Sequence, residues 1–75
     1  ETGVTMAANR HKHIRAANCR TVKDVVMARK HNDANVLCLG ADYVNWGDVY
    51  EMVTAFFITK FEGGRHKKRV GKLNV

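Results

Sequence analysis

Residues Val36–Leu39 form a continuous apolar run that Gly40 closes, and this run limits the folds open to the chain more than any other feature. Such a run is typical of a β-strand buried on both faces, as in a parallel sheet. A second, mostly apolar run at residues 14–19 is compatible with another buried strand. The sequence therefore predicts two buried strands.

Two helices are predicted around these strands. Thr21 can cap the first helix, with Asp24 three residues on, and apolar residues at helical spacing follow until residues 31–33. Asn45 can cap the second helix, and Lys60 closes it with the charge that the helix dipole favours. We expect the apolar stripe of this helix to pack on the core or at a subunit interface. The stripe consists of Val49, Met52, Val53, Phe56 and Phe57.

The order strand, helix, strand, helix predicts an α/β fold, because right-handed crossovers between these elements give a parallel sheet. The chain has 75 residues, no proline and no linker, which is typical of one small unit. A sheet of two strands is not stable by itself. We expect a three-layer Rossmann-like parallel sheet, of which this chain supplies about two strands and the flanking helices. A missing half or a partner chain would complete it.

The charge of +6 is unevenly spread: basic residues occupy residues 10–30 and 60–72, and only acidic ones lie between. The aromatic residues lie mainly in this acidic middle, whereas single-strand nucleic-acid binders interleave them with basic residues. This pattern favours a local anion site and no nucleic-acid partner, with a basic nucleic-acid-binding module as an alternative. No apolar run approaches the roughly 20 residues of a membrane span. Two cysteines without CxxC spacing indicate a reduced, cytoplasmic protein.

Residues 62–69 combine two glycines with a basic cluster. If the segment after the glycines is helical, Arg65 and Arg69 lie one turn apart on one face, with His66 beside them. Guanidinium groups bind phosphate in a bidentate manner, and a helix N-terminus adds free N–H groups. The segment can bind a small phosphorylated ligand, or it can be a solvated basic tail.

Residues 31–33 end the first predicted helix, so they lie at the edge of the sheet opposite the crevice where α/β proteins bind ligands. A role for His31 there would be played in a neighbouring subunit's site. The helix C-terminus favours a protonated imidazole, which suits a general acid. The alternative is a histidine that only caps the helix. His11 and His13 lack further ligands at suitable spacing, so no metal site is expected, and Cys19 and Cys38 are expected to pack in the core.

Four segments together resemble the B type of ribose-5-phosphate isomerase, a family that also includes the subunits of galactose-6-phosphate isomerase. They are Ala7-Ala8-Asn9, residues 14–16, residues 31–37 and residues 62–66. The resemblance spans essentially the whole chain and covers the C-terminal half of a typical member. It implies that residues 1–75 are the C-terminal half of a single sugar-phosphate isomerase domain.

The resemblance also implies an activity: ribose 5-phosphate and ribulose 5-phosphate interconvert by proton transfer through a cis-enediolate, without a metal or cofactor. His31 matches the histidine that opens the furanose ring. Arg65 and Arg69 match the arginines that hold the phosphate. Gly3 matches the last glycine of a loop whose backbone amides stabilise the enediolate. Further substrate-binding positions are Asn32 and His66.

The family's catalytic cysteine would precede Glu1, and Val4 stands where some members have a glutamate base. We therefore expect that this chain alone lacks the base and is inactive. In the family the site is shared between subunits, which predicts a homodimer or tetramer. A galactose-6-phosphate isomerase subunit, or a non-catalytic subunit of a heteromer, is the nearest alternative.

Overall fold

The computed structural model describes residues 2–40, 42 and 44–63. Its elements alternate as predicted, after a short helix that the sequence did not suggest. The elements are α1 (Thr2–Ala8), β1 (Ala16–Cys19), α2 (Val22–Asn32), β2 (Val36–Leu39), a 3-10 turn η1 (Trp46–Asp48) and α3 (Val49–Ile58). Gly3, expected in a loop, thus lies in the first turn of α1, and that expectation is wrong.

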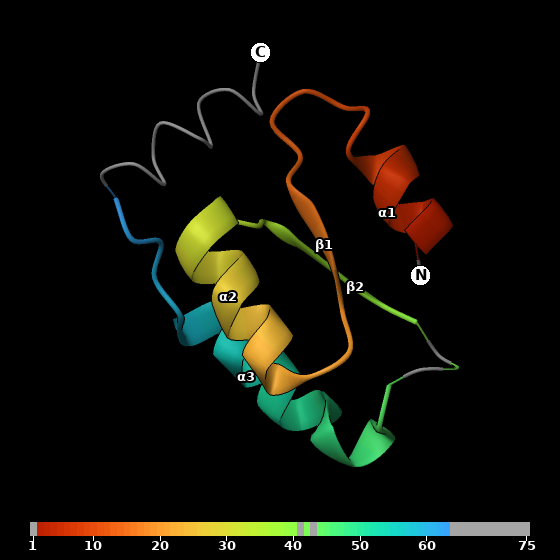
Figure 1. Ribbon diagram of the computed structural model, residues 1–75, viewed down its shortest axis with the longest axis vertical. Coiled ribbons are helices and arrows are strands. Elements are labelled where there is room, and N and C mark those ends of the chain that lie inside the picture. Colours follow the sequence, from red (N-terminus) through yellow and green to blue (C-terminus); the bar gives the residue numbers. More distant parts are fainter. Residues whose placement is uncertain (1, 41, 43, 64–75) are drawn as a thin grey trace.

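β1 and β2 form a parallel pair, with Ala16 opposite Val36 and Cys19 opposite Leu39. α1 lies on one side of this pair, and α2 and α3 lie on the other (Figure 1). The predicted fold, a parallel sheet with helices in layers on both sides, is confirmed. Burial of β2 on both faces is not confirmed: within β2 only Cys38 is buried, and the other three residues are partly exposed.

The predicted ends of α2 are confirmed. The backbone N–H of Asp24 donates to Thr21 Oγ1 at 3.1 Å, and the Asp24 carboxylate in turn accepts from the N–H of Arg20 at 3.0 Å. At the other end Asp33 adopts a left-handed conformation with φ 48°, and its N–H donates to the carbonyl of Ala28. Such a residue stops a helix and turns the chain sharply.

The start of α3 differs from the prediction. Asn45 caps the 3-10 turn by accepting from the N–H of Gly47 at 2.9 Å, and no side chain caps α3 itself. Of the predicted apolar stripe, only part packs on the core of this chain. Met52 is fully buried, but Val53 is 38% and Phe57 78% exposed. α3 packs against α2 on one side only, so Ala55 takes the place of these two residues in the core.

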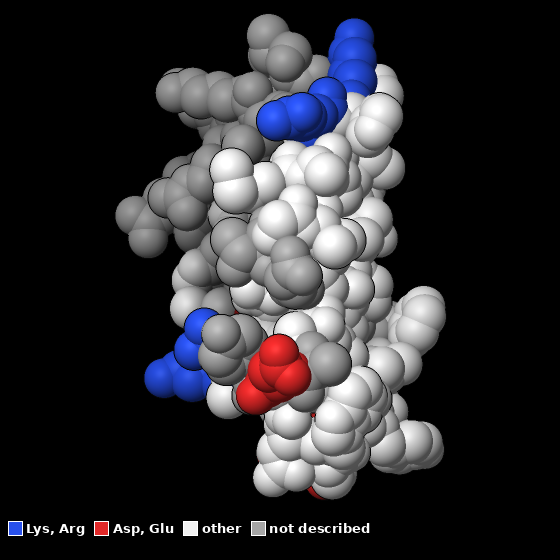
Figure 2. Space-filling model, turned by 90° about the vertical axis from the view of Figure 1, so that its right-hand side faces the viewer, with Lys and Arg blue, Asp and Glu red and all other residues white. Residues whose placement is uncertain are grey.

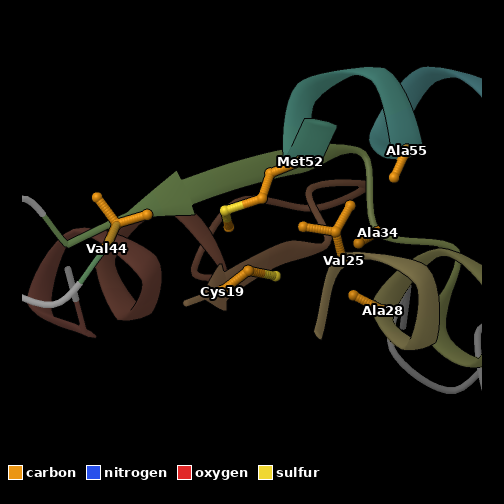
Figure 3. Packing of buried hydrophobic residues seen from close by; sticks show 7 residues of the cluster. All are labelled: Cys19, Val25, Ala28, Ala34, Val44, Met52 and Ala55. Carbon is orange, nitrogen blue, oxygen red and sulfur yellow. The ribbon is translucent and has the colours of Figure 1, made fainter. Parts of the chain in front are cut away.

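The core lies between the strands and the pair α2 and α3. It consists of Cys19, Val25, Ala28, Ala34, Val44, Met52 and Ala55. Met52, Val25 and Cys19 point toward one another at its centre (Figure 3). No helix within residues 2–40, 42 and 44–63 is long and apolar enough to cross a membrane.

Candidate active site

His31 and Asn32 are the last residues of α2. α2 runs from the end of β1 back to the start of β2, so they lie at the amino edge of the sheet, as the sequence predicted (Figure 1). α1 also leads into the start of a strand, so its first turn, with Gly3, lies toward the carboxyl edge. The chain therefore places His31 and Gly3 at opposite ends of its own sheet.

A cavity of about 410 Å³ lies between β1 and α2 and contains His31 in its wall. Its lining includes Asn18 and Cys19 from β1 and Asp24, Met27, His31 and Asn32 from α2. His31 thus faces an open groove rather than the core, and this is compatible with contact to a ligand.

A second cavity of about 350 Å³ lies beside the start of β1. Its lining includes Asn9, Ile14 and Arg15, and it shares Ala17 and Asn32 with the first cavity. Asn32 therefore borders both cavities. The predicted pair, His31 and Asn32, lines the first cavity together.

Two asparagines of the motifs have structural roles. Asn9 makes a pair of hydrogen bonds with Ala16, accepting from its N–H at 2.7 Å and donating to its carbonyl at 3.0 Å. Asn35 accepts from the N–H of Arg15 at 2.8 Å and donates to the carbonyl of His13 at 2.8 Å. Both side chains fix the loop between α1 and β1, where His13 has a φ of 71°.

The structure reveals a cluster that sequence reasoning missed, which we call the arginine clasp: Arg15, Arg29 and Asp33. The Asp33 carboxylate lies 3.3 Å from Arg15 Nη2 and 3.5 Å from Arg29 Nη1. Arg15 Nε also donates to the Asp33 carbonyl at 2.8 Å. The one signal in the sequence is the i, i+4 spacing of Arg29 and Asp33. The clasp holds the turn that immediately follows His31 and Asn32.

The segment that carries the basic cluster returns to the end of α2. The N–H of Glu62 donates to the carbonyl of Lys30 at 3.1 Å, and their side chains approach to 4.0 Å. Glu62 and Lys30, the residue before His31, are therefore neighbours, although they are about thirty residues apart in sequence. Arg65, His66 and Arg69 lie outside the described residues, and their roles stay predictions.

Cys19 is not a candidate base. Burial raises the pKa of its thiol from 9.0 to about 11, with smaller contributions from the charges of Asp24 and Cys38. Only the thiolate is nucleophilic, and this environment disfavours it. Cys38 is also buried, so both cysteines pack in the interior as predicted. In the described part of the chain, no three His, Cys, Asp or Glu side chains gather as a metal site requires.

The fold and this groove define a portion of a parallel α/β protein with a histidine and an asparagine at the end of a crossover helix. A family model described as Ribose/Galactose Isomerase matches residues 2–73. The chain belongs to this family.

Known structures support the same assignment. Ribose 5-phosphate isomerase B from Anaplasma phagocytophilum is 48% identical, with a TM-score of 0.89 over 95% of this chain and 49% of that one. The enzyme from Mycoplasma genitalium, solved with bound ribulose-5-phosphate, is 42% identical, with a TM-score of 0.90 over 96% of this chain and 47% of that one. The Escherichia coli enzyme ribose-5-phosphate isomerase B is 38% identical over 91% of this chain. The chain spans about half the length of the curated relatives that it matches.

Proposed function

We propose that this chain is part of an aldose–ketose isomerase that interconverts ribose 5-phosphate and ribulose 5-phosphate. The observation that supports the proposal most is the hydrogen bond from Glu62 to Lys30, because Glu62 precedes the predicted phosphate-binding arginines in sequence and Lys30 precedes His31. Family membership and the relative with bound ribulose-5-phosphate support a phosphorylated sugar as substrate. The names of these relatives favour a pentose over galactose 6-phosphate.

In the proposed mechanism His31 acts as a general acid that protonates the ring oxygen as the C1–O bond of the furanose breaks. A base then removes the proton from C2 of the open aldehyde and returns it to C1, through a cis-enediolate. Backbone amides at Gly3 stabilise the negative oxygen of this intermediate. Arg65 and Arg69 hold the phosphate, and Asn32 and His66 contact the sugar. The base comes from outside this chain, since Cys19 is inert and Val4 has no ionisable group.

We propose that residues 1–75 are the C-terminal half of one isomerase domain, with no cofactor. Among the described residues β1 pairs with β2 alone, and two cavities lie beside it. This supports the assignment, because a further strand and helix of the domain would fill the space. The half-length match to the relatives agrees with it. A cytoplasmic location belongs to the same proposal, since both cysteines are free thiols.

We further propose a homodimer or tetramer in which each site is shared between subunits. His31 and the Gly3 amide lie at opposite edges of one chain's sheet, so one subunit cannot present both to the same sugar. A two-fold arrangement brings the amino edge of one subunit to the carboxyl edge of the next. The oligomer would then be required for activity.

The test is an assay of the full-length gene product with ribose 5-phosphate, following the formation of ribulose 5-phosphate. Galactose 6-phosphate serves as the comparison substrate. Conversion of ribose 5-phosphate with a higher kcat/KM than galactose 6-phosphate supports the proposal. Conversion of galactose 6-phosphate alone would show that the proposed substrate, ribose 5-phosphate, is wrong. Conversion of neither sugar phosphate would overturn the proposed isomerase function.

The nucleic-acid alternative is tested separately by a salt titration, since polyanion binding weakens steeply as counterions are released. Figure 2 shows the face on which α1 lies, where described Lys and Arg side chains stand at the upper end and the lower left, and an acidic side chain lies beside the lower group. α1 itself carries no charged residue. The described helix on that face therefore offers no basic side chain to a polyanion.

A further inference from the structure

We propose that Arg29 is a positioning residue that aligns His31 with the segment leading to the phosphate-binding arginines. The inference rests on the proposed isomerase function and adds a residue outside the predicted substrate contacts. A single guanidinium group bridges the end of α2 to the end of α3. The site would then depend on one side chain to keep His31 and the exit from α3 at a constant separation.

The contacts of Arg29 reach both elements. Its Nη1 donates to the carbonyl of Ala34 at 2.6 Å and lies 3.5 Å from Asp33 Oδ1. Its Nε donates to the carbonyl of Thr59 at 3.1 Å. The side chain is only 21% exposed, so these bonds are shielded from water. A planar guanidinium can make all of them at once, whereas a lysine ammonium presents a single point of charge.

On the first side, Arg29 fixes the turn after His31. Asp33 has the left-handed conformation that ends α2, and Ala34, buried in the core, leads into β2. The clasp supplies both oxygens of the Asp33 carboxylate with a cationic partner. Because His31 and Asn32 directly precede this turn, its geometry determines where they face the groove.

On the second side, Arg29 fixes the exit from α3. Thr59 is the residue that ends α3, and the guanidinium lies 5.4 Å from the centre of the Phe56 ring in the last turns of that helix. Three residues further on, Glu62 bonds to Lys30, the residue after Arg29. The chain between Thr59 and Glu62 is thus tied to α2 at both ends. Loss of the first tie would shift the point from which Gly63 and the basic cluster depart.

The test uses two variants of the full-length gene product, Arg29→Met and Arg29→Lys. Arg29→Met keeps much of the aliphatic part of the side chain but removes the guanidinium group. The value of kcat/KM for ribose 5-phosphate should fall by about 100-fold, as expected when site residues are misaligned. The loss should include a raised KM. Arg29→Lys keeps a positive charge beside Asp33 but cannot bind the carbonyls of Ala34 and Thr59 at once. Compared with Arg29→Met, this variant should therefore have a kcat closer to wild type, while its KM stays raised.

Two controls separate positioning from stability. Lys23→Met removes a charge from an exposed position of the same helix and should leave both constants unchanged. Val25→Ala weakens the core and should lower the amount of folded enzyme without raising KM. An unchanged KM in both Arg29 variants, with activity that follows the folded fraction as in Val25→Ala, would overturn the inference.

Amide hydrogen exchange tests the same inference without an activity. If Arg29 ties the two segments, the Glu62 amide should lose protection in Arg29→Met and Arg29→Lys but keep it in Lys23→Met. Full protection in both Arg29 variants would contradict the positioning role. Should the wild-type protein fail to isomerise sugar phosphates, the proposed function falls, and the exchange result still decides whether Arg29 ties the segments.

Discussion

The backbone N–H of Glu62 donates a hydrogen bond to the carbonyl oxygen of Lys30 at 3.1 Å. The carbonyl belongs to the last turn of α2, where such groups lack partners within the helix. Glu62 satisfies one of them, and in doing so it fixes itself beside Lys30, the residue before His31. This hydrogen bond sets the distance between Glu62 and the end of α2, two parts of the chain that are far apart in sequence.

Replacement of His31 by alanine should slow conversion of a cyclic sugar phosphate by about 100-fold or more, the usual contribution of a general acid. A substrate that stays open-chain does not need ring opening and should lose much less. The measurement is the turnover of ribose 5-phosphate compared with that of ribulose 5-phosphate in the reverse direction. His11→Ala, in an exposed loop, is the matched control. Equal slowing of both substrates would remove the ring-opening role.

Replacement of Arg69 by alanine should raise KM for the sugar phosphate by about tenfold to 100-fold, because a charge-assisted hydrogen bond to phosphate is lost. Turnover at saturation should change less. Steady-state kinetics of the full-length gene product measure both constants, and Lys72→Ala controls for the loss of one positive charge. An unaltered KM in Arg69→Ala would contradict the phosphate assignment.

Met52 and Val53 are neighbours with opposite surroundings, since Met52 is fully buried and Val53 is 38% exposed. Met52→Ala should therefore lower the free energy of unfolding by about 2–5 kcal/mol, through lost burial and a cavity. Val53→Ala should cost well under half as much. Denaturant unfolding of the full-length gene product measures both. Similar losses would indicate that Val53 is also buried, for example at a subunit interface.

The raised pKa of Cys19 predicts a loss of stability at alkaline pH. Below pH 9.0 the thiol is protonated in both states, and above it the unfolded chain releases the proton while the folded protein holds it until about 11. The free energy of unfolding should thus fall as pH rises across this interval. Cys19→Ala should show a smaller fall over the same range. An identical pH dependence in both proteins would argue against the raised pKa.

Local sequence patterns were enough to predict the strands, α2 and its two ends. Thr21 and Asp24 cap α2 through bonds within four residues of each other, so their spacing alone carries the information. The apolar run at β2 predicts a strand in the same way. Sequence could not tell which residues of the helical stripe pack on the core, since Val53 and Phe57 fit the stripe but are exposed to solvent in this chain. A subunit interface at these two residues stays a prediction.

The candidate site was predicted only in part. The motif around residues 31–33 gave His31 and Asn32 their place at the end of a helix, and the structure confirms that place. The arginine clasp was not foreseen, because Arg15 and Asp33 are 18 residues apart and pair only once β1 and β2 lie side by side. Gly3 was expected in a loop, and it lies in a helix.

By itself, the sequence predicted the order strand, helix, strand, helix and the family, but not α1, and it suggested the residues for the chemistry. These depend on local spacing and on motifs, which are present before the chain folds. Only the tertiary structure decided which of these residues meet. Glu62 reaches the end of α2, while α1 with Gly3 lies on the other side of the strand pair from α2 (Figure 1), because contacts between residues far apart in sequence form only when the elements pack.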